Sequence, residues 1–370
     1  MGFSRQAENW IRLLTAKGLS GSDWMILRKR FTSDQLVEMA GSREGVRQLE
    51  RLTGAGISGI DNSNYERHLK AASENRLKAV TIDDNDYPEL LRQIESPPPV
   101  IFYRGRMKQE RLSIAVVGSR SAGRRGLVNA ERISRELSER GVAVVSGMAR
   151  GVDTAAHRGA LQGGGVTVAV VGCGLDIPYP PENSALSIDI TRNGCVMTEF
   201  MLGTPPLRHH FPMRNRIISG LCRGVVIVEA GIRSGAMITS RWAADQGREV
   251  FAVPGPVEHP GSAGPHKLIK EGAVLVENAD DILGFLDPFC SFNAEESTGR
   301  KAELKGLGEM EKKIMNLLEL EPMHIDFIAR ELDTPAEKIM PVLLRMEIEG
   351  YCRSFGGGMF VLEKRYGISK

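Results

Sequence analysis

Glycine, serine and arginine follow the strand-like apolar segments in the middle of this chain, where an enzyme would place a catalytic acid or thiol. Arg120 and Arg150 each come a few residues after an apolar run. Asn215 stands between Arg214 and Arg216. In an open parallel sheet the ligand binds beyond the carboxyl ends of the strands, so loops that follow strands are where a site is expected. Glycine lets backbone N–H groups approach a phosphate, and arginine offers a planar fork of donors. The pattern therefore predicts an anion-binding rim.

Positive charge is concentrated locally, although the net charge is only +2. Residues 111–130 and 200–228 contain arginines but no Asp or Glu. Phe211 lies in the second of these intervals, a few residues after Arg208, in what we expect to be a polar loop. An aromatic ring among cations is how a protein stacks a single-stranded base, although an ordinary core anchor is the alternative.

Three strand-to-helix turns carry the remaining candidates for phosphate binding. The first turn, 118–126, resembles a dinucleotide fingerprint, but an arginine enters it. A dinucleotide site also needs an acid at the end of the second strand to bind the ribose, whereas Glu136 and Glu139 fall inside a predicted helix. We therefore assign this turn to phosphate without a nicotinamide ribose. Ser146 and Gly147 form the second turn, and Ser234 and Gly235 form the third, in which Ser234 is expected to cap a helix.

Catalytic and metal-binding patterns are weak. Asp153 and His157 are four residues apart and so share a helix face, but we expect Asp153 to cap the helix and His157 to pack behind the loop. Ser234 does not lie in the Gly-x-Ser-x-Gly pattern of a nucleophile elbow. The five cysteines are widely spread, without metal or disulfide spacing. We predict no catalytic residue, no metal and no cofactor.

The order of apolar patterns predicts a Rossmann-like, doubly wound α/β sheet between two helical regions. Residues 8–77 show helical periodicity with glycine-containing turns, which predicts a small packing domain, with a helix-hairpin-helix module that grips a DNA backbone as the alternative. Residues 79–82 and 100–103 are expected to form strands, and an extended linker covers 87–99. Strands of the sheet are expected near 113–117, 142–146, 166–171, 195–199, 225–229 and 249–253, with the clearest helices at 126–140 and 236–246.

The C-terminal region predicts a winged helix after a linker at 288–308. Residues 310–320, 325–332 and 336–349 indicate three helices, and 351–362 indicate a hairpin. A winged helix can bind duplex DNA, but the third helix carries three acids, Glu337, Glu347 and Glu349, against two bases, Lys338 and Arg345, which favours a protein-contact or stabilising role.

Several motifs together resemble the DNA-processing protein A family, also called DprA or Smf. They are Val116-Val117-Gly118-Ser119-Arg120, Ser146-Gly147-Met148-Ala149-Arg150-Gly151-Val152-Asp153, Gly174-Leu175-Asp176 with Tyr179-Pro180 and Asn183, Phe211-Pro212-Met213-Arg214-Asn215-Arg216, Ser234-Gly235 and Val253-Pro254-Gly255. The resemblance implies a sterile-alpha-motif-like helical domain at 1–78, an extended Rossmann-like domain at 79–287 and a winged helix at 309–365. Pro181 departs from the family pattern, because some members carry a basic residue there.

The same resemblance implies a non-catalytic, cytoplasmic protein that binds single-stranded DNA, protects it and loads the recombinase RecA during natural transformation. The residues assigned to DNA and phosphate are Gly118, Ser119, Arg120, Ser146, Gly147, Arg150, Arg208, Phe211, Arg214, Asn215, Arg216, Ser234 and Gly235. A homodimer contact is assigned to His266, Ile269 and Leu275. Leu268, Ile269 and Leu275 also exceed the apolar side chains that their short segment needs for internal packing. The sequence has no signal-peptide pattern and no apolar run of membrane-spanning length, so we expect no membrane contact.

Two other functions fit the fold class. The first is a phosphoribohydrolase, which would carry a Pro-Gly-Gly-x-Gly-Thr-x-x-Glu run; the segment 229–239 lacks that final glutamate. The second is a regulator that binds duplex DNA through the winged helix.

Overall fold

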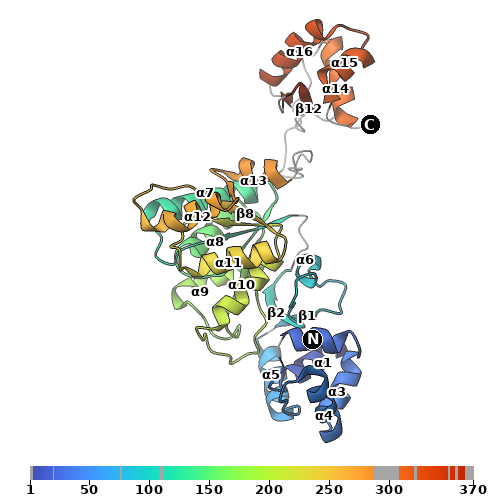
Figure 1. Ribbon diagram of the computed structural model, residues 1–370, viewed down its shortest axis with the longest axis vertical. Helices are drawn as coiled ribbons and strands as arrows, with labels where there is room; N and C mark the ends of the chain where they lie inside the picture. The colour runs from blue at the N-terminus through green and yellow to red at the C-terminus, as the bar shows by residue number, and fades with distance from the viewer. Residues whose placement is uncertain are drawn as a thin grey trace. The chain divides into compact units, whose positions relative to one another are not determined.

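The structure is a computed structural model that describes residues 3–19, 21–75, 77–107, 112–286, 308–320, 323–348, 351–354 and 357–362. The chain divides into two compact units, Met1–Ile282 and Leu283–Lys370 (Figure 1). Each is described by itself. Except for Gly308, the linker predicted at 288–308 lies outside the described residues.

Five helices open the first unit: α1 (Arg5–Leu14), α2 (Gly21–Arg28), α3 (Ser33–Ala40), α4 (Arg43–Thr53) and α5 (Asn62–Glu74). Polar side chains begin four of them, because Ser4, Thr32, Ser42 and Asp61 each accept a hydrogen bond from a first-turn N–H. Gly54 ends α4 in the left-handed conformation that favours glycine. The helical periodicity of this region is therefore confirmed.

The five helices share one hydrophobic core with the sheet that follows. Trp10 donates its indole N–H to Asp83 at 2.8 Å, and Arg28 pairs with the same carboxylate at 2.7 Å. The His68 ring lies 4.9 Å from the ring of Phe102, and its Nδ1 accepts the Leu202 N–H at 3.1 Å. The described helices between residues 5 and 74 therefore pack against the sheet within the first compact unit, and the domain boundary expected at residue 78 stays a prediction.

A nine-stranded sheet is the centre of the described first unit. Its strands are β1 (Lys78–Thr81), β2 (Val100–Gly105), β3 (Ser113–Val117), β4 (Ala143–Ser146), β5 (Thr167–Val170), β6 (Cys195–Thr198), β7 (Gly224–Ile227), β8 (Glu249–Ala252) and β9 (Val274–Leu275). The order is β1-β2-β6-β5-β4-β3-β7-β8-β9. The pairs β1–β2 and β2–β6 are antiparallel, and the others are parallel. The predicted fold class is confirmed. The linker predicted at 87–99 was wrong in part, because it includes the short helix α6 (Glu89–Arg92).

The strand order reverses between β3 and β7. The chain runs outward from β3 to β6 and then returns beside β3, so two neighbouring loops leave the sheet in opposite directions and open a crevice. The helices of this region are α7 (Arg124–Glu139), α8 (Val152–Gln162), α9 (Ser184–Asn193), α10 (His210–Gly220), α11 (Gly235–Asp245), α12 (Ala263–Lys270) and α13 (Ala279–Leu286). Helices α7 and α8 pack on each other, as do α10 and α11.

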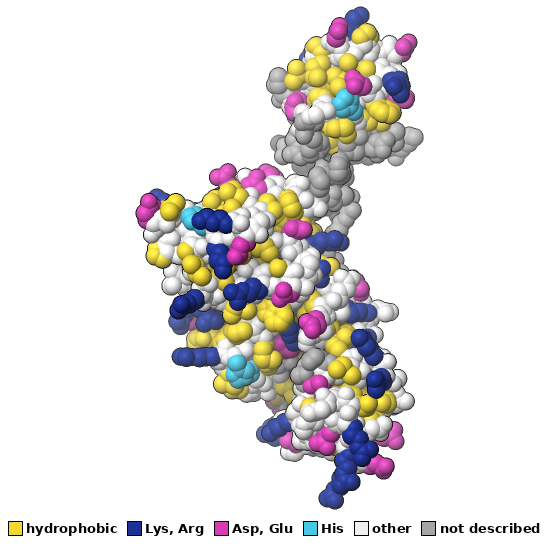
Figure 2. All heavy atoms as spheres, viewed as in Figure 1, with side chains coloured by type: hydrophobic (Ala, Val, Ile, Leu, Met, Phe, Trp, Pro, Cys, Tyr) yellow, Lys and Arg dark blue, Asp and Glu magenta, His cyan; other side chains and the backbone are white. Residues whose placement is uncertain are grey.

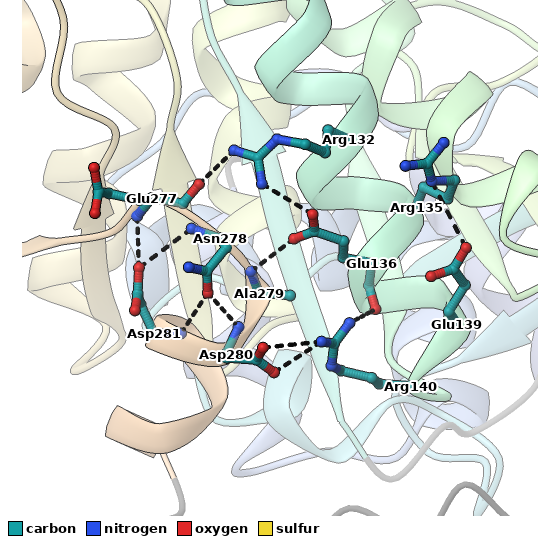
Figure 3. Close-up of polar contacts among 10 residues, drawn as sticks. All are labelled: Arg132, Arg135, Glu136, Glu139, Arg140, Glu277, Asn278, Ala279, Asp280 and Asp281. Atoms are coloured by element: carbon teal, nitrogen blue, oxygen red, sulfur yellow. Dashed lines mark hydrogen bonds and ion pairs between the residues drawn. The ribbon is translucent and has the colours of Figure 1, made fainter.

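Polar contacts join the second half of α7 to residues 277–281, and we call this contact the seam (Figure 3). Arg132 pairs with Glu136 at 2.9 Å and also donates to the Glu277 carbonyl. Glu136 accepts the Ala279 N–H at 3.1 Å, and Arg140 pairs with Asp280 at 2.8 Å. The seam fixes the first turn of α13 to α7.

The second unit has the predicted winged-helix order: α14 (Glu309–Leu320), β10 (Met323–His324), α15 (Ile325–Glu331), α16 (Ala336–Ile348), β11 (Cys352–Ser354) and β12 (Met359–Leu362). Residues 321–322, 349–350, 355–356 and 363–365 of the predicted domain lie outside the described residues. Arg345 of α16 lies 3.6 Å from Glu311, and Glu347 accepts the Ser354 N–H at 2.8 Å. Arg345 and Glu347 of α16 are therefore engaged in contacts within the unit.

Candidate nucleic-acid interface

A cavity of about 760 Å³ lies at the carboxyl ends of the strands, where the strand order reverses. We call it the main cavity. Of the residues that we assigned to DNA, it is lined by Gly118, Ser119, Arg120, Arg208, Phe211, Arg214, Asn215, Ser234 and Gly235. Residues far apart in the sequence thus converge on one hollow, as the sheet topology requires.

The glycine turn after β3 uses its amides inside the protein. Both carboxylate oxygens of Glu229 accept the Gly123 N–H, at 3.1 and 3.2 Å, and the Glu229 carbonyl accepts the Ser119 N–H at 2.6 Å. A Cβ at Gly126 would lie 2.3 Å from that carboxylate, so glycine is needed there to admit Glu229. The amino end of α7 is therefore occupied by a carboxylate at the place where a dinucleotide-binding protein holds phosphate.

The amino end of α11, in contrast, faces the main cavity with unused donors. Within the described residues, the N–H groups of Gly235 and Ala236 have no hydrogen-bond partner, and both residues line the cavity. Ser234 occupies the cap position, as predicted, but its hydroxyl caps no amide. Free first-turn amides and the helix dipole favour an anion at this end.

Arg120 and Arg208 are the exposed cations of the main cavity. Among the residues the structure describes, no carboxylate lies within ion-pairing distance of either guanidinium. Arg120 instead lies over the Phe211 ring, with its Cζ 5.0 Å from the ring centroid. Phe211 is in the first turn of α10 and not, as we expected, in a loop. We call the exposed edge formed by Arg120, Arg208 and the amino end of α11 the rim.

Arg214 lines the same cavity but is only 3 % exposed. Its guanidinium donates to the carbonyls of Gly147 and Val170 and to the Asn215 side chain. Burial lowers the pKa of Arg214 to about 10, so it stays charged at neutral pH, and Asp153 opposes the shift. Burial also raises the pKa of Asp153, which Arg214 opposes. Arg214 thus ties two strand ends together as a structural cation.

Other assigned residues lie off the main cavity. Arg216 is 7 % exposed and pairs with the Glu199 carboxylate at 2.5 Å, so its charge is already matched within the protein, and its assignment to DNA stays a prediction. Ser146 is fully buried and donates to the Val116 carbonyl at 2.7 Å, which removes it from the rim as well. Gly147 and Arg150 line a smaller cavity of about 50 Å³ beside the first, which we call the small cavity, and Arg150 pairs with Glu182.

Asp153 and His157 do not form an acid–base pair. The helix cap is Gly151 instead of Asp153, whose carboxylate accepts the Ala149 N–H at 3.3 Å. His157 is fully buried, and its Nδ1 lies 2.7 Å from the Thr167 hydroxyl. Burial lowers the pKa of His157 to about 3, so it is neutral and structural, as predicted. Burial also raises the pKa of the Cys173 thiol to about 11, which makes it a poor nucleophile.

Sequence reasoning missed two contributors to the site. Tyr179 lines both cavities and is 38 % exposed, yet we quoted it only as part of a family motif. Glu229 organises the glycine turn through contacts that span more than a hundred residues. An aromatic residue in a loop that follows a strand was a usable signal for Tyr179, whereas no local pattern indicates the role of Glu229.

The segment assigned to a dimer contact follows β8 and includes the edge strand β9. Leu275 is 48 % exposed on that edge, and Ile269 is half-buried. The ring of His266 contacts the Gly255 carbonyl at 3.0 Å. The prediction that Leu268 is not needed for internal packing was wrong, because Leu268 is buried in the core.

The surface has basic and apolar side chains mixed on one flank. Figure 2 shows Lys and Arg side chains along the left edge of the first unit, with apolar side chains beside them. On the face shown, the winged-helix unit carries acidic and basic side chains together. Among the described helices, none combines the length and apolar character that a membrane crossing requires.

The fold and the cavity define a Rossmann-like protein whose strand ends present arginines, aromatic rings and a free helix terminus, followed by a winged helix. Residues 78–287 match the family described as DNA recombination-mediator protein A, and residues 299–358 match the DprA winged helix domain. The chain belongs to the DNA recombination-mediator protein A family, which confirms the resemblance drawn from the sequence.

Relatives of known name cover most of the chain. Protein Smf of Escherichia coli is 32 % identical over 96 % of both chains, and DNA processing protein DprA of Streptococcus pneumoniae is 40 % identical over 70 % of this chain and 95 % of its own. The solved S. pneumoniae structure covers 77 % of this chain and 98 % of its own, with a TM-score of 0.63 and 35 % identity. A Helicobacter pylori DNA processing protein A structure, described for its single-stranded DNA binding mode, covers 56 % of this chain and 95 % of its own, with a TM-score of 0.51 and 27 % identity.

Proposed function

We propose that this protein binds single-stranded DNA in the main cavity. The observation that carries the proposal is the rim, where Arg120 and Arg208 lack carboxylate partners among the described residues and the free amides of α11 face the same hollow. Phosphates of a flexible single strand can reach these donors, and the rings of Phe211 and Tyr179 can contact bases. A similarity to the H. pylori protein supports the choice of single-stranded DNA.

Such a site reads phosphates and π-faces, so it has no marked base preference. If four to six phosphates are neutralised, log K should fall with log salt at a slope of roughly −3 to −4, using about −0.7 per contact. The test is a titration of oligo-dT and of duplex DNA of equal length at two salt concentrations. Tighter binding of oligo-dT with this salt dependence supports the proposal. A salt-independent affinity, or a preference for duplex, contradicts it.

We also propose that the protein forms a two-fold dimer through His266, Ile269 and Leu275. The exposed Leu275 lies on the unpaired edge of β9, and in an isologous contact each side chain is used twice. Ile269→Glu and Leu275→Arg should therefore give folded monomers by light scattering that bind long single strands less tightly, because two linked sites are lost. A wild-type protein that is monomeric at high micromolar concentration contradicts the dimer.

The biological role that we infer is a cytoplasmic, non-catalytic recombination mediator that protects incoming single strands and loads RecA during natural transformation. Family membership supports the mediator class. The test is RecA filament formation on oligo-dT already covered by a single-strand-binding protein, with and without this chain. No acceleration by the wild-type protein contradicts the loading role. If chromatography instead detects release of the base from AMP, the protein is a phosphoribohydrolase.

A further inference from the structure

The Phe211 ring is already surrounded by protein. Arg120 lies over it, Arg214 has its Cζ 5.9 Å from the ring centroid, and a Cβ at Gly172 would lie 3.2 Å from the ring. The ring is only half exposed to begin with. A nucleobase can stack flat on Phe211 only after Arg120 moves, and that movement would separate a phosphate-binding cation from the ring beside it.

The Tyr179 ring stands beside Phe211 with more of its surface open. The two ring centroids are 5.5 Å apart, and the ring planes are tilted by 41°. Tyr179 is 38 % exposed, and within the described residues its hydroxyl makes no hydrogen bond. Its ring lines both the main cavity and the small cavity, so it forms part of the wall between them.

We propose that Tyr179 forms a nucleobase subsite of its own, on which an unpaired base of single-stranded DNA stacks, while Phe211 supports the Tyr179 ring from behind. The inference rests on the proposed single-stranded DNA binding and names the residue that contacts a base. Arg120, which lines the same two cavities, is placed to hold the phosphate of the stacked nucleotide.

The chemistry of the subsite suits any base. An exposed aromatic face offers dispersion and π-stacking to purines and pyrimidines alike, and adjacent arginines hold the backbone at the right distance. Tyr179, Arg120 and Arg150 all line the small cavity, so a strand stacked on Tyr179 has both arginines near it.

The first experiment compares oligo-dT with an abasic deoxyribose-phosphate strand of the same length. Tyr179→Ala and Tyr179→Leu should bind oligo-dT about 5- to 150-fold more weakly, a range that corresponds to the stacking of one base. Both should bind the abasic strand as the wild type does, because its phosphates still meet the arginines. Tyr179→Phe should retain wild-type affinity for both strands.

A second experiment reads stacking directly and does not require an alanine variant that folds. In Tyr179→Trp, the added indole fluorescence should be quenched by oligo-dT and not by the abasic strand. The control is Ile188→Trp, which places an indole at a 60 % exposed position that lines neither cavity. The wild type, with three tryptophans, sets the baseline.

The outcomes separate this inference from the proposed function. If the wild type binds neither strand, the proposed function fails and the subsite fails with it. If the wild type binds oligo-dT with the expected salt dependence but Tyr179→Leu binds equally well, or the new indole is not quenched, the subsite alone is overturned. Equal weakening toward both strands would show that Tyr179 only supports the fold, which also overturns it.

Discussion

Arginines occupy the seam and the rim of the same α/β unit, and they meet different partners in the two places. At the seam, Arg132 and Arg140 pair with Glu136 and Asp280 and also donate to backbone carbonyls (Figure 3). At the rim, the neighbour of Arg120 is an aromatic ring, and no described carboxylate pairs with it. The arginines of the seam are paired with carboxylates of the same chain, whereas those of the rim have no carboxylate partner among the described residues.

A similar contrast separates two helix termini at the strand ends. The amino end of α7 is closed by the Glu229 carboxylate, and the amino end of α11 keeps free amides toward the main cavity. A glycine turn or an arginine therefore does not identify an anion site by itself. The difference depends on whether another part of the chain already supplies the negative charge.

The largest expected effect is on stability, and it compares a buried structural arginine with an exposed arginine of the rim. Arg214→Met removes the cation beside the buried Asp153 and leaves two carbonyls without their donor. Because two buried carbonyls lose their donor and the buried Asp153 loses a nearby positive charge, the free energy of unfolding should fall by about 3–5 kcal/mol in urea titrations. Arg208→Ala, an exposed rim change, is the control and should stay within about 0.5 kcal/mol. Equal effects of the two substitutions would remove the distinction between a structural and a ligand-binding arginine.

The next effect is a loss of stability in mild acid, which arises from buried histidines and not from the arginines of either region. Burial lowers the pKa of His157 to about 3 and that of His68 to about 4, below the ordinary value of 6.5. The contribution of each neutral histidine to the free energy of unfolding is complete above pH 6.5. It is lost as the pH falls, because the unfolded chain then binds protons that the folded chain does not. Each should cost about 2 kcal/mol by pH 5.

The measurement is the free energy of unfolding at pH 7, 6 and 5 for the wild type and for His157→Asn, whose amide can still face Thr167. The variant should show a smaller loss on acidification. An unchanged pH slope would mean that His157 is protonated at little cost and would contradict its buried, neutral state. The raised pKa values of Asp153 and Glu199 act with the opposite sign and are common to both proteins.

The third prediction compares how removal of an arginine from the rim or from the seam changes the affinity for single-stranded DNA and its salt dependence. Arg120→Ala and Arg208→Ala should each weaken binding of every single-stranded sequence alike and make the salt slope shallower by about 0.7. Arg140→Ala removes the same charge at the seam and is the matched control, with an unchanged slope. If all three variants shift the slope equally, only the total charge matters and the rim has no special role.

The smallest effect concerns the stability of the seam itself. Arg140 and Asp280 are 33 % and 66 % exposed, so solvent screens their attraction. Asp280→Asn should therefore lower the free energy of unfolding by less than about 1 kcal/mol, measured in urea. A loss of several kcal/mol would show that the seam is a buried, cooperative network, and that its difference from the rim is one of burial as well as pairing.

Much of the architecture could be predicted from sequence because it depends on local patterns. Continuous apolar runs such as 225–228 indicate strands buried on both faces, and the glycine-containing turns between them separate the elements. The extended segment before β2 was misjudged, since α6 is a single turn of helix. Its apolar residue Leu91 is buried by tertiary packing that no local period reveals.

For the site, the sequence alone determined the residue types that gather at the strand ends, because topology brings every loop after a parallel strand to the same edge. The tertiary structure decided which of those residues face solvent. Arg214 reaches the Gly147 carbonyl across 67 positions, and Glu229 reaches Gly123 across 106. Pairings at such separations leave no periodic trace in the chain, yet they convert one arginine into a structural cation and close one helix terminus. Arg120, Arg208 and Tyr179 remain exposed because no distant segment covers them among the described residues.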